Sequence, residues 1–165
     1  MPIPTSTSVQ ESAVIEAHSS DVWHLIKLPE FSKWWSKLDK SEWVKGTSAE
    51  TDIVKWTFKD GTELQVKQEE HSVSTYTRKT NVNHHLESID HYVTYSVISS
   101  DPALSYTSIV STLRVYPVTS GTHAGHTYVT WTANFSSDAD AGVMEDAKFK
   151  RREGLADLAK AVAKK

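Results

Sequence analysis

The chain contains 165 residues, which is enough for one domain with a sizeable core, and 38% of them are apolar. Its 18 basic and 21 acidic residues give a net charge of −3, which argues against nucleic-acid binding, and it has no cysteine for disulfides or thiolate metal sites. Because no apolar run approaches the roughly 20 residues that cross a bilayer and Met1–Ser12 lacks the pattern of a signal peptide, we expect a cytoplasmic protein without membrane insertion.

The first quarter of the chain predicts a strand followed by two short helices. Apolar and polar residues alternate over Val9–Ala17, which is typical of a half-buried strand. The run His18–Asp21 is a helix N-cap signal, because hydroxyl and carboxylate oxygens can accept hydrogen bonds from the free first-turn amides. Apolar residues at helical spacing follow as far as Pro29, and a second helical stretch is predicted over Glu30–Leu38.

From Ser41 onward the pattern changes to strands and turns. The predicted strands are Trp43-Val44, leading into Gly46, then Asp52–Phe58, Thr62–Glu70, His91–Ile98, Tyr106–Val118 and Thr127–Phe135. Asp60-Gly61 is a strong hairpin signal, since glycine adopts positive φ without strain. Residues 71–90 are polar and show no clean period, so a long inserted loop and an extra hairpin both remain open there.

One long helix is predicted over Asp138–Lys165. Its apolar stripe is formed by Met144, Ala147, Arg151, Leu155, Leu158 and Val162. Such a helix must bury its stripe, and the only large partner is the sheet. The elements therefore indicate an α+β fold in which a curved antiparallel sheet of about seven strands surrounds the C-terminal helix. A sheet bent around one helix leaves a gap beside it, which favours an internal cavity.

Several short motifs occur in the order expected for a known superfamily. They are Val22-Trp23 with Ile26, Phe31, Trp34-Trp35, Gly46, Asp60-Gly61, Tyr95-Ser96-Val97-Ile98, Arg114-Val115-Tyr116-Pro117-Val118, Thr127-Tyr128-Val129-Thr130-Trp131 and Gly154-Leu155-x-x-Leu158. With them the chain resembles the Bet v 1-like or START-like helix-grip (SRPBCC) superfamily, in particular its polyketide cyclase/dehydrase-like branch. The resemblance spans nearly the whole chain as a single domain, residues 1–165. It departs from the family at residues 71–90, where the segment between the flanking strands is longer than in the family pattern.

The resemblance implies a hydrophobic cavity between the sheet and the C-terminal helix. In this superfamily such a cavity takes lipids, sterols, polyketides or other secondary metabolites. It does not imply one chemistry, since members include carriers, receptors, cyclases, dehydratases and isomerases.

Two basic residues, Lys148 and Arg151, lie within about 60° of the centre of the apolar stripe. Either can place a cation beside the cavity and orient a carboxylate, enol or phenolate group of a ligand. Alternatively, both side chains pack along their aliphatic stems and carry their charges out to solvent.

His91 and Glu70 are candidates for proton transfer. Alternation places His91 on the strand face of Tyr95, so its imidazole can point inward and act as a general acid or base. Gln68 and Glu70 share the face of Leu64 on an earlier strand and would be its polar partners. A histidine satisfied by a neighbour or by water at the strand end is the alternative, and a slip of one residue in register would reverse the pairing.

Aromatic side chains are candidates for lining the cavity by stacking on a flat ligand, although tryptophan also serves as ordinary core packing. The predicted ligand-binding residues are Trp34, Trp35, Trp56, Leu64, Val66, Gln68, His91, Tyr95, Trp131, Met144, Lys148, Arg151 and Leu155. The catalytic role stays unassigned, with His91, Glu70, Lys148 and Arg151 as the candidates.

The histidine clusters do not predict a metal site. His84-His85 and His123-x-x-His126 lack a third ligand at a recognisable spacing. No Gly-rich phosphate loop or nucleophile elbow is present either, so we expect no metal and no cofactor.

Three functions remain open from the sequence. The first is binding of a small hydrophobic molecule in the cavity, by a monomer or weak dimer. The second is a cyclase, dehydratase or isomerase that acts on a polyketide-like or terpenoid substrate in the same cavity. The third is an interaction protein in which residues 71–90 contact another chain, since polar loops of that length are often functional.

Overall fold

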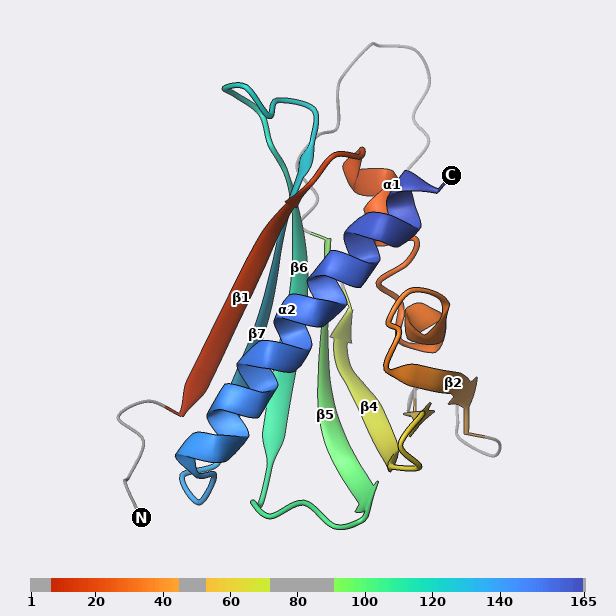
Figure 1. The fold of residues 1–165 in the computed structure, drawn as a ribbon, viewed down its shortest axis with the longest axis vertical. Coiled ribbons are helices and arrows are strands. Elements are labelled where there is room, and N and C mark those ends of the chain that lie inside the picture. Colours follow the sequence, from red (N-terminus) through yellow and green to blue (C-terminus); the bar gives the residue numbers. More distant parts are fainter. Residues whose placement is uncertain (1–6, 45–52, 72–90, 165) are drawn as a thin grey trace.

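The computed structural model describes residues 7–44, 53–71 and 91–164. In these ranges the chain forms a seven-stranded antiparallel sheet and a long C-terminal helix that runs diagonally across it (Figure 1). The elements are β1 (Ser8–Ile15), α1 (Ser19–Trp23), the 3₁₀ helix η1 (Leu28–Lys33), β2 (Leu38–Trp43), β3 (Ile53–Phe58), β4 (Glu63–His71), β5 (His91–Asp101), β6 (Ile109–Pro117), β7 (Thr127–Phe135) and α2 (Ala141–Ala163). The strand order is β1-β7-β6-β5-β4-β3-β2. The predicted α+β helix-grip architecture is confirmed.

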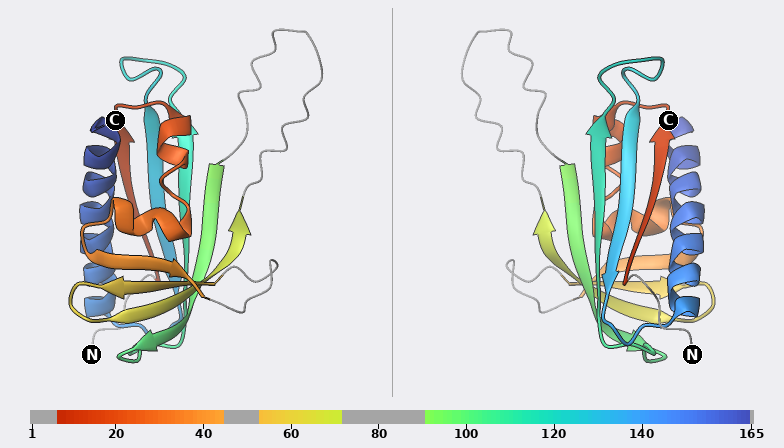
Figure 2. Two further views of the ribbon diagram at one scale, coloured as in Figure 1. Left: turned by 90° about the vertical axis from the view of Figure 1, so that its right-hand side faces the viewer. Right: turned by 90° about the vertical axis from the view of Figure 1, so that its left-hand side faces the viewer.

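The helix α2 buries one stripe against the curved sheet. Figure 2 shows the sheet bending around one side of α2, with β2, β3 and β4 turned toward it. The buried residues of α2 are Met144, Ala147, Arg151, Gly154, Leu155, Leu158 and Val162. They include every member of the predicted stripe. The helix begins at Ala141 rather than at Asp138, because the Asp140 carboxylate caps it by accepting a hydrogen bond from the Val143 amide at 2.8 Å.

Gly154 allows α2 to approach the sheet closely. A Cβ atom at this position would lie 2.6 Å from Cζ3 of Trp131 and 3.3 Å from Nε1 of Trp35. Glycine in a helix interior is unfavourable by roughly 1 kcal/mol relative to alanine. Its presence in α2 is therefore explained by packing against the tryptophans rather than by helix propensity.

The second predicted helix is wrong in its C-terminal half. The chain forms a 3₁₀ helix only as far as Lys33, and β2 begins at Leu38, inside the predicted helical stretch. Aromatic residues at helical spacing misled the prediction, because they serve tertiary packing: Trp34 Nε1 donates to the Leu25 carbonyl at 2.6 Å. Pairing of Leu38 with Phe58 on β3 then sets the strand conformation.

The N-cap of α1 and the first residue of β6 differ from the sequence prediction. The cap of α1 is His18, whose Nδ1 accepts from the Ser20 amide at 3.3 Å, so an imidazole nitrogen takes the place of the expected oxygen. The strand β6 begins at Ile109 rather than at Tyr106, because Thr107 and Ser108 donate their amides to side chains that follow β7. The other predicted strands match β1, β3, β4, β5 and β7 to within a few residues at each end.

The sheet and α2 enclose an aromatic core. Trp56 and Trp131 are fully buried, and Phe31 of η1 stacks on Trp56 with ring centroids 4.9 Å apart. A smaller apolar cluster around Phe135 and Met144 packs at the N-terminal end of α2. Gly46 and nearly all of the predicted insertion, residues 72–90, lie outside the described residues, so the single-domain prediction with its insertion stays a prediction.

Candidate functional site

A cavity of about 950 Å³ lies between the N-terminal half of α2 and the sheet. Its walls come from the residues after η1, the β3–β4 hairpin, the loop between β5 and β6, and the inner faces of β5, β6 and β7. The turn at Gly61 has φ of 90°, which lets β3 reverse tightly into β4. Exposed residues such as Lys59 and Ser105 are among the lining, so the cavity opens to the surface.

One wall of the cavity is aromatic and rigid. Trp35 and Trp131 meet edge to face with centroids 5.1 Å apart, and Trp56 and Tyr95 do so at 5.3 Å. Trp131 Nε1 donates a hydrogen bond to the Tyr95 hydroxyl at 3.0 Å, which fixes the two rings relative to each other. A flat or chain-like apolar molecule would find this surface already formed.

Arg151 forms the polar end of the cavity. Its side chain projects from α2 among apolar neighbours and is only 7% exposed. One terminal nitrogen donates to Ser111 Oγ at 3.0 Å and the other to the Ala147 carbonyl at 3.2 Å, while the guanidinium lies 5.4 Å from the Trp131 ring. Burial lowers the pKa of Arg151, but a guanidinium is so strongly basic that the group stays charged at neutral pH.

Two tyrosines accompany this cation. Tyr95 and Tyr106 line the cavity and lie near enough to Arg151 to influence its pKa. Burial raises the pKa of both phenols above the ordinary value of 10, although the positive charge of Arg151 works against the shift. Both tyrosines therefore remain neutral at physiological pH and keep a hydroxyl that can donate.

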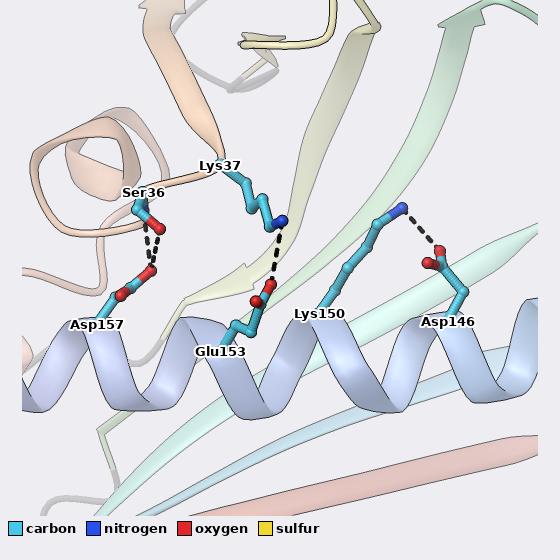
Figure 3. A network of polar contacts seen from close by, with 6 residues as sticks. All are labelled: Ser36, Lys37, Asp146, Lys150, Glu153 and Asp157. Carbon is cyan, nitrogen blue, oxygen red and sulfur yellow. Dashed lines mark hydrogen bonds and ion pairs between the residues drawn. The ribbon is translucent and has the colours of Figure 1, made fainter.

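Ionic contacts tie α2 to the segment after η1 at the edge of the cavity. Figure 3 shows Lys37 reaching Glu153 and Ser36 reaching Asp157. The Lys37 Nζ lies 3.3 Å from the Glu153 carboxylate, and the Ser36 amide donates to Asp157 at 3.0 Å. A further pair, Lys150 with Asp146 at 2.7 Å, stays within α2. The carboxylates of Asp146 and Glu153, which line the cavity, are therefore each held by a lysine.

The structure brings part of the predicted ligand-binding set together. The residues that line the cavity are Trp35, Trp56, Leu64, Tyr95, Trp131 and Arg151. Four other predicted residues do not line the cavity but belong to the core that packs around it. Trp34, Val66 and Leu155 are buried in the main core, and Met144 is buried in the smaller cluster. Gln68 is half-buried on β4 opposite Tyr95 and is not part of the cavity lining.

His91 and Glu70 are not brought together. His91 pairs with the buried Val115 and so lies on the inner face as predicted, but its ring packs on Trp23 at 4.8 Å, at the end of β5 away from the cavity. A bulge in β4 makes Glu69 an extra residue, so that Glu70 pairs with Thr94 and is exposed. This is the register slip that reverses the face of Glu70.

The two basic candidates on α2, Lys148 and Arg151, differ in their position relative to the cavity. Lys148 is partly exposed and pairs with Glu145 at 2.8 Å, so its charge reaches solvent along an aliphatic stem. Lys148 does not line the cavity, whereas Arg151 does. Of the four candidate acid–base residues, Arg151 alone belongs to the site.

Sequence reasoning missed Ser111 and Tyr106. Ser111 lies on the inner face of β6 between the buried residues Ile109 and Leu113, and is itself buried. A small polar residue within a run of inward apolar positions was a signal that could have revealed the polar end of the cavity. Tyr106 belongs to an irregular loop, where no periodicity indicates the direction of a side chain.

The described residues do not assemble a metal centre. No group of three or more histidines and acidic residues that could hold a metal ion occurs within ranges 7–44, 53–71 and 91–164. His123 and His126 approach each other in the loop between β6 and β7 with ring centroids 5.6 Å apart, and His84-His85 lies outside the described residues. In the same ranges, no helix has the length and apolar character needed to cross a membrane.

Residues 6–163 match the model of the family described as polyketide cyclase/dehydrase and lipid transport. The chain belongs to this family. The predicted resemblance to the polyketide cyclase/dehydrase branch is thereby confirmed, and membership implies the binding of hydrophobic small molecules. A search of curated proteins found no match to the chain.

Solved structures share the fold of this polyketide cyclase/dehydrase and lipid transport family member. The protein XoxI from Bacillus cereus has 19% identity and a TM-score of 0.69, with coverage of 95% of this chain and 96% of that chain. An uncharacterised protein from Bacillus thuringiensis has 19% identity and a TM-score of 0.68, over 94% and 98% of the two chains. A solution structure from Thermobifida fusca has 20% identity and a TM-score of 0.64, over 96% and 94%. At these identities the likeness establishes the fold alone.

Proposed function

We propose that the protein binds one small, largely apolar molecule, such as a lipid, sterol, polyketide or other secondary metabolite, in the cavity between α2 and the sheet. The observation that carries the proposal is the cavity itself, whose volume of about 950 Å³ falls at the upper end of the range of known ligand pockets. Family membership, with its description of lipid transport, supports the same class of ligand.

Physical chemistry favours binding by such a site. Each Å² of apolar ligand surface that leaves water contributes roughly 25 cal/mol before the entropy of association is subtracted. The aromatic wall of Trp35, Trp56 and Trp131 is formed by core packing that exists without a ligand. Little ordering of the protein is therefore needed when a molecule enters, which lowers the free-energy cost of binding.

The alternative function, a cyclase, dehydratase or isomerase, needs an acid and a base within hydrogen-bond reach of one substrate. Of the candidates, Arg151 alone lines the cavity, and a guanidinium that stays protonated cannot serve as a base. Of the lining carboxylates, Asp146 and Glu153 are paired with lysines, and exposed Asp60 accepts a hydrogen bond from the Thr62 amide in the β3–β4 turn. The geometry therefore supports a binding function better than proton transfer. The hypothesis of a partner-binding segment at 71–90 falls on residues outside the described ranges.

A titration with Nile red, a neutral dye that fluoresces on entering an apolar site, tests the proposal. Val97 lines the cavity, whereas the next residue, Ile98, is 48% exposed on the opposite face of β5. We expect saturable binding of one dye per chain, weakened at least about tenfold (about 1.4 kcal/mol) in Val97→Trp and unchanged in Ile98→Trp.

A second filling variant, Leu64→Trp, approaches the cavity from β4 and should weaken binding in the same way. Circular dichroism checks that each variant is folded. Absence of saturable binding to the wild type, or equal effects of the Val97 and Ile98 variants, would refute a binding cavity at this place.

A further inference from the structure

Arg151 is a buried positive charge without an acidic partner among the described residues. Its contacts with the described residues are neutral: the Ser111 hydroxyl, the Ala147 carbonyl and the Trp131 ring. The guanidinium has five N–H groups, and Nε has no acceptor in the described part of the chain. Isolated buried charges are strongly unfavourable unless a counter-charge or several hydrogen bonds compensate them.

The acidic residues nearest to Arg151 are already engaged. Asp146 and Glu11 are the carboxylates close enough to raise its pKa. Asp146 forms an ion pair with Lys150 at 2.7 Å, and Glu11 accepts from Arg152 at 3.0 Å. Each of these carboxylates therefore has another cation, and the charge of Arg151 stays available to the cavity that it lines.

Two neutral phenols lie near Arg151 in addition to the Ser111 and Ala147 oxygens that accept from it. Tyr95 and Tyr106 remain protonated, since burial raises the pKa of both phenols. The hydroxyl of Tyr95 accepts a hydrogen bond from Trp131 and is also hydrogen-bonded with Ser111, and Tyr106 brings a second phenol close to Arg151. A cation flanked by neutral donors is complementary to an anionic oxygen group.

We propose that the ligand is an amphipathic monocarboxylate, whose apolar body packs on the tryptophan wall and whose carboxylate lies against Arg151. The inference rests on the proposed binding function and specifies its ligand class. A carboxylate is favoured over a phosphate ester because Arg151 is the one buried cation among the described lining residues, and it balances a single negative charge. Of the lining lysines, all exposed, Lys37 and Lys150 are paired with Glu153 and Asp146, and Lys59 lies at the opening. A phosphate carries close to two negative charges at neutral pH and would leave one of them unpaired in a buried site.

Probes of equal chain length test this proposal: decanoate, decanol, decylamine and decyl phosphate, each titrated by calorimetry and by displacement of Nile red. We expect the wild type to bind decanoate at least about tenfold more tightly than decanol, a difference of about 1.4 kcal/mol. Arg151→Met, which keeps the length of the stem and removes the charge, should abolish this preference while decanol still binds. Arg151→Lys should retain part of the preference, since it keeps the charge without the planar donor array.

Lys148→Met is the matched control, because Lys148 lies on the same helix but pairs with Glu145 at the surface. It should leave the preference for decanoate intact. Equal binding of decanoate and decanol, or an unchanged preference in Arg151→Met, would overturn the carboxylate assignment while the binding cavity stands. Tighter binding of decyl phosphate or decylamine than of decanoate would overturn it as well. If neither the probes nor Nile red bind, the proposed function is refuted, and the carboxylate assignment is refuted with it.

Discussion

At the scale of single residues, Arg151 is placed where a charge opposes the stability of the unliganded protein. Its two hydrogen bonds go to neutral groups, and no described carboxylate balances its charge. Replacing buried ionic groups by apolar residues of similar volume is often neutral or stabilising. We therefore predict that Arg151→Met raises the free energy of unfolding of the ligand-free protein by about 1 kcal/mol. Urea denaturation measures this change, with Lys148→Met as the reference. A clear loss of stability in the Arg151 variant would instead assign the guanidinium a structural role.

Asp138 links the loop before β6, which lines the cavity, to the start of α2. Its carboxylate accepts hydrogen bonds from the Ser136 hydroxyl and from the amide and hydroxyl of Thr107, and these lower its pKa from 3.8 to about 2. Because the folded pKa lies below the unfolded one, the carboxylate stabilises the fold above pH 4, and this contribution is lost as the pH falls toward 2.

Asp138→Asn should therefore be less stable than the wild type at pH 7, and the difference should shrink as the pH falls from 4 to 2. Urea denaturation of both proteins across this range measures it. A stability difference that does not depend on pH would contradict the role given to the carboxylate. Because Asp138 is fully exposed, solvent screening limits the size of the effect.

At the residue scale the sequence could identify candidates but could not choose among them. Lys148 and Arg151 are less than one helical turn apart and both lie within about 60° of the centre of the stripe, so periodicity makes both of them candidates. The choice depends on what the sheet presents opposite each residue: Ser111 of β6 receives Arg151, whereas Lys148 finds Glu145 on its own helix. That information is tertiary and has no local signature.

At the scale of elements, the contact between α2 and β7 depends on Gly154. An alanine there would place its Cβ atom 2.6 Å from Cζ3 of Trp131. Overpacking of this kind destabilises by about 1–3 kcal/mol, which outweighs the roughly 1 kcal/mol that alanine gains over glycine in a helix. We predict that Gly154→Ala lowers the free energy of unfolding by about 1 kcal/mol.

A double-mutant cycle isolates the cause. Phenylalanine at position 131 lacks the indole atoms Cζ3 and Cη2 that the new methyl group would meet. Gly154→Ala combined with Trp131→Phe should therefore be more stable than the sum of the single effects, by about 1 kcal/mol in urea denaturation. Strictly additive effects would show that Gly154 is retained for another reason.

Strands and helices with strong periodicity were predictable, and irregular ones were not. The stripe of α2 and the Asp60-Gly61 hairpin follow from local pattern and from the positive φ of glycine. The bulge at Glu69 does not, because a bulge depends on the partner strand. The same applies to the start of β2, because its first residue, Leu38, was predicted as the end of a helix and is defined as strand by pairing with β3.

At the scale of the whole molecule, the order of elements was sufficient to predict the sheet and the crossing helix, whereas the family came from a resemblance carried by short motifs along the chain. Figure 2 shows the sheet curving around α2, and the prediction of a cavity followed from a curved sheet that meets a straight helix over only part of its surface. Its position toward the N-terminal half of α2 could not be predicted, because it depends on tertiary packing: the core of the protein divides into a main cluster and a smaller one at the N-terminal end of α2. The contacts of Lys37 and Ser36 with α2 then hold the layers together beside the opening (Figure 3).

The central claim is that this space admits a guest molecule, and a crystal structure of the protein grown with decanoate tests it most directly. The account predicts continuous density for the alkyl chain inside the cavity, against Trp56 and Trp131, with the carboxylate directed toward Arg151. Density for decanoate elsewhere on the molecule, or a cavity closed by rearranged side chains at saturating decanoate, would contradict it.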